Sequence, residues 1–168
     1  MSRNELARLY DAHAPALFRF AMALTGTEAD TRDVLQEVFL RLAKRPAEEV
    51  IHDPAAWLYR ATRNLVTDHA RRRAVKQRAL ERMASETSNG PTPFSETDAE
   101  GLPPALAAQA LASLPREQRA VVHLKIWEEM TFARIAEVLE ISPNTAASRY
   151  RYAMQNLRAA LPLTVPDV

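Results

Sequence analysis

Apolar side chains recur every three or four residues through the first part of the chain, which is the spacing of one face of an α-helix. The first run extends from about Arg3 to Leu24. Gly26 follows it, and glycine readily adopts the left-handed conformation at a helix end. A second run starts after Thr27, whose hydroxyl can cap a helix, and stops near Arg45, just before Pro46. The pattern therefore predicts two amphipathic helices.

A third helix is predicted to begin at Asp53-Pro54, where a carboxylate cap precedes a proline in the first helical position. We expect it to continue to about Arg82, a length of roughly 40 Å. Its inward face is expected to carry Trp57, Leu58, Ala61, Leu65 and Val66.

The helical pattern disappears from Met83 to Pro104, a stretch rich in proline, glycine, serine and threonine. Such a composition is typical of a flexible linker, with a random-coil span of about 25 Å. We therefore expect two small helical domains, residues 1–82 and 105–168, joined by the linker 83–104.

The second domain is predicted to hold four helices: Ala105 to Leu114, Arg116 to about Glu128, Phe132 to Leu139, and Pro143 to about Leu161. Val121, Val122, Leu124 and Ile126 are the expected apolar members of the second of these. Thr131 and Ser142 are suitable caps for the last two helices. These last two helices have the spacing of a helix-turn-helix, whose second helix lies in the DNA major groove.

Composition agrees with an all-α fold. Glycine occurs only three times, whereas alanine and leucine, which favour helices, are abundant. The absence of cysteine excludes disulfides and cysteine-ligated metals. No apolar run approaches the ~20 residues that span a bilayer, and the N-terminus has no signal-peptide core. We expect a soluble intracellular protein of the cytoplasm, without membrane insertion.

Catalysis is not supported by the sequence. The four histidines show no metal-binding spacing, and there is no glycine-rich phosphate loop. We therefore expect neither an enzyme nor a bound cofactor or metal.

Charge is unevenly distributed along the chain. Residues 57–82 hold eight cations against two carboxylates, and residues 83–115 hold four carboxylates and no cation. One polar face of the third helix carries Arg60, Arg63, Asn64, Asp68, Arg71 and Arg72. Arginine clusters of this kind neutralise phosphates, although a solvated surface is the alternative interpretation. Trp57, Tyr59 and Phe39 could stack on unpaired bases, but for Trp57 and Phe39 a place in the core is favoured.

The last helix offers a second candidate nucleic-acid surface. Its side chains turned away from the apolar stripe include Asn144, Thr145, Ser148, Arg149, Arg151 and Tyr152. Asn and Arg can read adenine and guanine edges, and hydroxyls suit phosphate oxygens. A helix pair by itself is a weak signal, because any small helical bundle can contain one.

Three segments together resemble one family, the extracytoplasmic-function (ECF) subfamily of bacterial RNA polymerase sigma factors. They follow one another in the family's order: ADTRDVLQEVFLRL, DPAAWLYRATRNLVTDHARRR and LASLPREQRAVVHLKIWEEMTFARIAEVLEISPNTAASRYRYAMQNLRAAL. The resemblance covers nearly the whole chain except the linker. It implies a promoter-specificity subunit whose partners are core RNA polymerase and promoter DNA, expected to be a monomer when free. Family members are often held inactive by an anti-sigma protein.

The resemblance also implies roles for particular residues. The first segment is similar to the part that docks on core polymerase, which assigns docking to Asp33, Gln36, Glu37 and Arg41. The second is similar to the part that recognises and melts the minus-ten element, with the loop 46–53 forming a pocket for an extruded base. Asn64 and Asp68 are then candidates for contacts with base edges. The candidates for contacts with the DNA sugar-phosphate backbone are Arg60, Arg63, Arg71 and Arg72.

The third segment is similar to the domain that reads the minus-thirty-five element, and Ser148, Arg149 and Arg151 fall where the family contacts DNA. Asn144, Thr145 and Tyr152 lie on the same helix face and complete the predicted site, although Tyr152 stands where the family often has Lys or Arg. One departure concerns the turn, where the family usually has glycine and this chain has Glu140. A non-glycine residue with positive φ is strained there. Family linkers thread polymerase channels, and the linker acids could mimic the charge of RNA.

Two other classes of protein remain open from the residues alone. A stand-alone helix-turn-helix regulator explains residues 131–160 but gives no role to the first domain. A purely structural helical protein would show no salt-dependent DNA binding.

Overall fold

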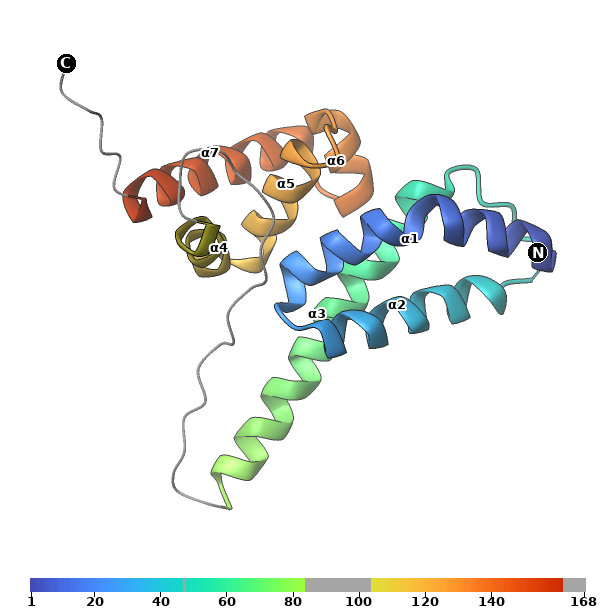
Figure 1. Cartoon of the computed structure of the whole chain (residues 1–168), viewed down its shortest axis with the longest axis horizontal. Coiled ribbons are helices and arrows are strands. Elements are labelled where there is room, and N and C mark those ends of the chain that lie inside the picture. Colours follow the sequence, from blue (N-terminus) through green and yellow to red (C-terminus); the bar gives the residue numbers. More distant parts are fainter. Residues whose placement is uncertain (47, 84–103, 162–168) are drawn as a thin grey trace. The chain divides into compact units, whose positions relative to one another are not determined.

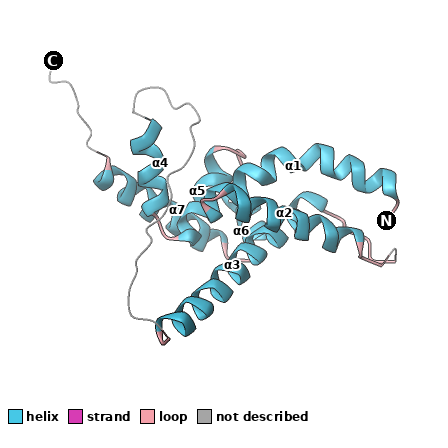
Figure 2. Ribbon diagram, turned by 60° about the horizontal axis from the view of Figure 1, so that its bottom comes forward, coloured by secondary structure: helices cyan, strands magenta, loops and turns pink. Residues whose placement is uncertain are grey.

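The computed structural model describes residues 1–46, 48–83 and 104–161, and every element of secondary structure in these ranges is a helix (Figures 1 and 2). The prediction of an all-α fold is therefore confirmed. The chain divides into two compact units, Met1–Thr92 and Pro93–Val168. The predicted linker lies almost entirely outside the described residues. The helices are α1 (Arg3–Thr25), α2 (Glu28–Ala43), α3 (Pro54–Glu81), α4 (Pro104–Ser113), α5 (Arg116–Ile126), α6 (Phe132–Leu139) and α7 (Pro143–Ala160).

Helix ends coincide with the predicted capping residues. The side chains of Thr27, Asp53, Thr131 and Ser142 each accept a hydrogen bond from the backbone N–H three residues further on, at 3.0–3.3 Å. Gly26 ends α1 with φ 78°, in the left-handed region. These local bonds fix where the helices begin because they satisfy backbone groups that lack a partner within the helix.

The core of the first unit lies between α1, α2 and α3. Its fully buried side chains come from all three helices: Leu17 and Phe20, Val34 and Val38, and Leu58 and Leu65. The ring of Phe20 meets that of Tyr59 edge to face, with centroids 5.3 Å apart.

Two expectations about α3 are wrong. Tyr59, expected to be available for base stacking, is only 4% exposed and belongs to the core. Trp57, expected to point inward, is half-buried, with the Arg45 guanidinium 5.4 Å from its ring centroid. The buried face of α3 includes Thr62, whose hydroxyl donates to the Leu58 carbonyl and so enters the core without an unpaired polar group. The buried face of α3 includes both Leu58 and Tyr59, and Trp57 lies at its edge.

The core of the second unit is centred on α5, which packs against α6 and α7. Buried residues of α5 include Val121, Val122 and Leu124. Ile126, expected among them, is 47% exposed because it is the last residue of α5 and lies off the packed face. His123 is buried in its place, stacked on Trp127 with ring centroids 5.3 Å apart.

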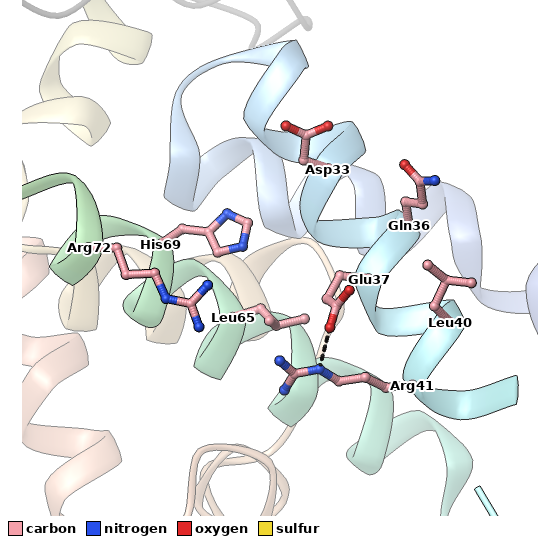
Figure 3. Close-up of a pocket in the computed structure, with 8 residues that line it drawn as sticks. All are labelled: Asp33, Gln36, Glu37, Leu40, Arg41, Leu65, His69 and Arg72. Atoms are coloured by element: carbon pink, nitrogen blue, oxygen red, sulfur yellow. Dashed lines mark hydrogen bonds and ion pairs between the residues drawn. The ribbon is translucent and has the colours of Figure 1, made fainter. Parts of the chain in front are cut away.

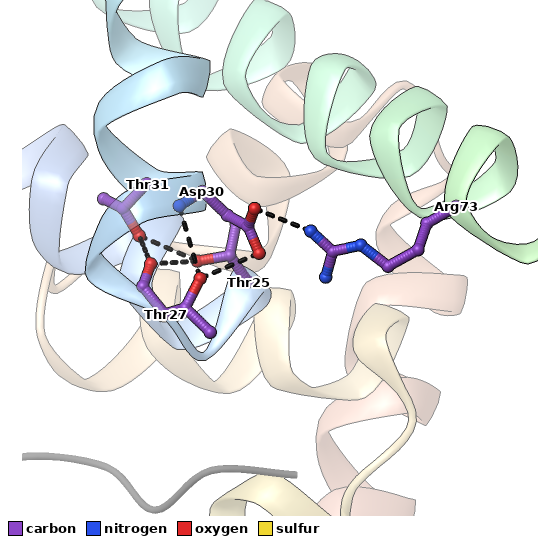
Figure 4. A network of polar contacts seen from close by, with 5 residues as sticks. All are labelled: Thr25, Thr27, Asp30, Thr31 and Arg73. Atoms are coloured by element: carbon purple, nitrogen blue, oxygen red, sulfur yellow. Dashed lines mark hydrogen bonds and ion pairs between the residues drawn. The ribbon is translucent and has the colours of Figure 1, made fainter. Parts of the chain in front are cut away.

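α3 is much longer than the core requires. All residues from 71 to 83 are exposed, and in Figure 1 this half of the helix projects beyond α1 and α2. One ion pair holds it from the side: Arg73 contacts Asp30 at 2.6 Å. Asp30 lies in the first turn of α2, inside a network of hydroxyls from Thr25, Thr27 and Thr31 (Figure 4).

Among the described residues, no helix combines the length and apolar character needed to cross a bilayer.

Candidate functional site

A groove of about 420 Å³ runs between α2 and α3 in the first unit (Figure 3). The four residues predicted to dock on a partner, Asp33, Gln36, Glu37 and Arg41, all line it. The structure therefore places this predicted set on one exposed surface.

Four further residues in the groove were not predicted as docking residues: Leu40, Leu65, His69 and Arg72. Leu40 is 43% exposed, an apolar side chain among polar ones. A signal for it was present, since Leu40 stands three and four residues from Glu37 and Gln36 and so shares their helix face. His69 comes from α3, and no spacing within α2 could have shown that it belongs here.

Ion pairing in the groove keeps Glu37 charged. Its carboxylate accepts a hydrogen bond from Arg41 Nε at 2.9 Å. This bond lowers the pKa of Glu37 below its ordinary value, and the positive charges of Arg41 and Lys44 act in the same direction. The groove consequently presents a stable negative charge beside an exposed leucine.

The six predicted residues of α3 do not all lie on one surface. Arg60, Asn64, Asp68 and Arg71 follow one another at intervals of four, four and three, so they form a row along the helix. Asn64 and Arg71 are exposed, and Arg60 and Asp68 are half-buried. Arg63, also half-buried, lies beside the row.

Arg72 is separated from that row. It lines the groove between α2 and α3, together with the acids of the predicted docking set. A residue predicted for DNA and residues predicted for a protein partner thus meet in one groove (Figure 3).

The loop 46–53 precedes α3 and is predicted to receive an extruded base. Arg45 and Trp57, which flank this loop in sequence, contact each other. Arg45 also pairs with Glu49 at 2.7 Å across the start of this loop. Val50 is 71% exposed, and one residue of the loop, Ala47, lies outside the described residues. The half-buried ring of Trp57 is the aromatic surface nearest to this loop in sequence.

In the second unit, α6 and α7 form the predicted helix pair. Glu140 ends α6 with φ 56° and ψ 45°, so the turn adopts the left-handed conformation despite the missing glycine. Asn144, Arg151 and Tyr152 are exposed, whereas Thr145, Ser148 and Arg149 are half-buried. All six come from α7.

Arg149 has a partner that the sequence did not predict. Its Nη1 donates to the Glu117 carboxylate of α5 at 3.0 Å, with the Arg149 side chain 30% exposed and that of Glu117 45% exposed. The bond ties the candidate recognition helix to the core helix of the unit, and it leaves the other guanidinium nitrogens for a ligand. The two residues are 32 positions apart, so no local pattern indicates the pair.

Within the described parts of the chain, no group of three or more histidines and carboxylates could hold a metal ion.

Comparison with protein families gives two matches, one in each unit. Residues 9–75 match Sigma-70 region 2, and residues 105–157 match Sigma-70, region 4. The first range contains the groove and the row on α3, and the second contains the helix pair.

Comparison with individual proteins gives relatives over almost the whole chain. The ECF RNA polymerase sigma factor SigL of Mycobacterium tuberculosis is 39% identical over 160 residues, covering 91% of this chain and 86% of that protein. The ECF RNA polymerase sigma factor SigE of Mycolicibacterium smegmatis is 33% identical, covering 94% of this chain and 60% of that protein.

Among solved structures, the fold is similar to that of the sigma factor RpoE of Bartonella quintana, crystallised with the anti-sigma factor NepR. The TM-score is 0.76 at 21% identity, covering 96% of this chain and 97% of that one.

Proposed function

The chain belongs to the ECF family of RNA polymerase sigma factors, and from this membership we propose that its two units grip different promoter elements. Sigma factors are non-catalytic subunits that bind core RNA polymerase and promoter DNA, and this one directs promoter-specific initiation of transcription. In the proposal, residues 1–82 dock on core polymerase and open the minus-ten element. Residues 105–168 bind the minus-thirty-five element.

The observation that carries this division is the groove between α2 and α3. It has two carboxylates and an exposed leucine of α2 on one side, and Leu65, His69 and Arg72 of α3 on the other. A helix of core polymerase that presents cations around an apolar residue would complement Asp33, Glu37 and Leu40. Complementary charge speeds association and selects the partner.

The docking role is tested by Glu37→Lys. Reversing the charge places a cation against the partner's cations, and we expect core binding to weaken at least about tenfold, since like charges in an interface cost several kcal/mol. The measurement is the affinity of the labelled protein for core polymerase, with run-off transcription as a second readout.

The matched control is Glu28→Lys. Glu28 forms the same kind of intrahelical pair on α2, with Arg32 four residues on, but lies outside the groove. Core binding should survive this change. Equal losses in both variants, or full binding by Glu37→Lys, would remove the docking assignment.

For the minus-ten element, the row on α3 supports a division of labour. Asn64 and Asp68 have the hydrogen-bonding groups that read base edges, and Arg60, Arg63 and Arg71 supply phosphate contacts. Arg72, which lines the groove between α2 and α3, is proposed to contact the sugar-phosphate backbone of the DNA. An extruded base would enter the loop 46–53, where contacts must recover the few kcal/mol lost in unstacking.

For the minus-thirty-five element, α7 is proposed as the helix in the major groove. Its N-terminal half carries Asn144, Thr145, Ser148 and Arg149 within reach of base edges, with Arg151 and Tyr152 placed for the backbone. Arg151 lies over the Tyr152 ring, 5.3 Å from its centroid, which orders two long exposed side chains before DNA arrives.

Other parts of the proposal follow from family membership. The protein works in the cytoplasm, where core polymerase is, and is a monomer when free. A protein of anti-sigma type is a further proposed partner. The linker acids Glu86, Glu96, Asp98 and Glu100, which lie outside the described residues, are proposed to occupy a channel for nucleic acid.

The whole proposal is tested by run-off transcription from a promoter library with purified core polymerase. We expect transcripts that depend on the added protein and that share two conserved elements. The absence of protein-dependent transcripts would overturn the division of roles.

A further inference from the structure

The two ends of the connection between α2 and α3 are joined by one side chain, that of Arg45. This residue lies just after the end of α2, and its backbone N–H donates to the Leu42 carbonyl at 3.3 Å. Its guanidinium lies 5.4 Å from the centroid of the Trp57 ring, in the first turn of α3. Arg45 therefore holds the end of one helix against the beginning of the next.

The same guanidinium also contacts the loop itself. Its Nη2 pairs with the Glu49 carboxylate at 2.7 Å, and the backbone N–H of Glu49 donates to the Pro46 carbonyl at 3.1 Å. At the other end of the loop, the Asp53 carboxylate caps α3. Residues 50–52 lie between these two fixed points, and none of their side chains is buried. The loop thus presents an accessible segment between two anchored ends.

The inward position of the Arg45 guanidinium is unfavourable in one respect. Only 27% of the Arg45 side chain is exposed, and its Nε is buried with no hydrogen-bond partner among the described residues. A buried donor without a partner is destabilising, because it has lost its hydrogen bonds to water. A surface arginine without structural contacts would keep its charged end in water and avoid this loss. The ion pair with Glu49 and the contact with Trp57 hold the guanidinium inward.

These contacts indicate a structural task for Arg45 and not a direct contact with DNA. The Glu49 carboxylate neutralises the guanidinium, which makes Arg45 a weaker phosphate ligand than an unpaired arginine. A pocket for an extruded base, in contrast, needs contacts that are already in place, because they must recover the free energy lost in unstacking. A loop that had to become ordered on binding would spend part of that free energy on its own ordering.

We propose that Arg45 is a positioning residue for the extruded base of the minus-ten element. Through Glu49 and Trp57 it fixes the shape of the loop segment 48–53, and this shape determines how sharply one base is selected. The inference rests on the proposed function, in which the loop receives the base. It adds that selectivity at this base depends on an ion pair and a ring contact behind the pocket.

The first test variant is Arg45→Gln, which removes the charge opposite Glu49 and the guanidinium beside Trp57. The second is Glu49→Gln, which breaks the same ion pair from the loop side. Holoenzymes assembled from wild type and from each variant are compared on single-stranded minus-ten probes from the strongest promoter of the library. The probes differ from one another at one position each, so the measurement gives a selectivity for every position of the element.

We expect both variants to lose selectivity at the same single position, at least about fivefold, a factor within the usual range for the contacts to one base. The preferred base should bind less tightly there, and selectivity at the other positions should not change. The double variant should be no worse than Arg45→Gln, because both changes break one interaction. Arg45→Lys should restore most of the selectivity, since lysine can pair with Glu49 and lie over the Trp57 ring.

The matched control is Arg32→Gln, which removes the same charge from an ion pair of the same spacing, with Glu28 on α2, away from the loop. Binding of each variant to core polymerase, measured without DNA, shows that the first unit is folded. If Arg45→Gln does not fold, Glu49→Gln decides the question by itself, because it changes only an exposed side chain of the loop.

An equal loss in Arg32→Gln, or a uniform loss at every position of the element, would overturn the proposal. So would a loss in Arg45→Gln without one in Glu49→Gln, which would mean that the guanidinium itself contacts the DNA. If wild-type holoenzyme shows no selectivity on any minus-ten probe, the proposed function fails first, and this result differs from the failure of Arg45 alone.

Discussion

Asp30 shows how one side chain can serve a helix end and a tertiary contact together. One carboxylate oxygen accepts from the Thr27 hydroxyl at 2.8 Å, and the other accepts from Arg73 at 2.6 Å. The bond from Arg73 is the main reason why the pKa of Asp30 lies below its ordinary value of 3.8, although partial burial opposes the shift. The pair joins the first turn of α2 to the exposed C-terminal half of α3.

This lowered pKa predicts a pH dependence. A carboxyl group whose pKa is lower when folded stabilises the protein above its unfolded pKa, and the stabilisation is lost as pH falls through the folded pKa. Arg73→Gln should therefore destabilise the first unit by up to about 1 kcal/mol at neutral pH, because Arg73 is largely exposed. The difference from wild type should vanish towards about pH 2, where the carboxyl group is protonated.

Urea unfolding at several pH values measures this effect, with Trp57 fluorescence as the reporter in a Trp127→Phe background. A difference between wild type and Arg73→Gln that stays constant from neutral to acidic pH would contradict the assignment.

At Arg149, a structural and a recognition role can be separated. Glu117→Ala and Arg149→Ala each remove one partner of the 3.0 Å bond, so each should lose a small folding free energy, up to about 1 kcal/mol. Only Arg149→Ala should also lose promoter discrimination, by about 1–3 kcal/mol at one base pair. Binding to promoter and single-base variants measures this. An equal loss of discrimination in Glu117→Ala would mean that Arg149 acts mainly by holding α7 in place.

The limits of sequence reasoning at this scale have a common cause. Caps such as Thr131 and Ser142 were predictable because their partners lie three residues away. The partners of Arg149 and Arg73 come from other helices, 32 and 43 positions away, so only the fold reveals them. The burial of Tyr59 was missed because a shift of one position around a helix decides which aromatic ring enters the core.

At the scale of elements, the turn between α6 and α7 carries local strain. Glu140 adopts a left-handed conformation that costs a residue with a Cβ about 1–2 kcal/mol. Glycine loses more entropy on folding, so the expected net gain from Glu140→Gly is about 0.5–1 kcal/mol. Thermal unfolding of the second unit measures it.

Glu140→Ala separates strain from charge, because it removes the carboxylate and keeps the Cβ. It should not stabilise the unit. Glu137→Gly, inside α6, should destabilise it by about 1 kcal/mol. Stabilisation by alanine as large as that by glycine would show that the side chain, and not the backbone, was unfavourable.

Element boundaries were predicted well where a cap or a proline marks them, as at Asp53-Pro54. The predicted boundaries were less accurate where no capping residue or proline marks the end of a helix. α5 ends at Ile126, two residues before the predicted end, and the exposed Ile126 and buried His123 follow from how this helix packs. Periodicity alone does not specify which neighbours surround a short helix.

For the whole molecule, two separate cores imply two separate stabilities. Leu58→Ala removes a fully buried side chain from the first unit, and Leu124→Ala removes one from the second. Each change should cost about 2–5 kcal/mol in its own unit only. The two tryptophans report independently, since Trp57 lies in the first unit and Trp127 in the second. Urea curves from single-tryptophan variants measure the effect, and a shift of both transitions by one substitution would show that the units unfold together.

The meeting of Arg72 with the docking acids has a consequence for the order of events. A cation brought by polymerase to Asp33 and Glu37 would repel the Arg72 guanidinium from the groove and make it available to a phosphate. Thermodynamic reciprocity then requires that DNA which binds Arg72 strengthens the grip on polymerase by the same factor. Under these assignments the protein would hold the enzyme most firmly at a start site, and escape from that site would loosen both attachments at once.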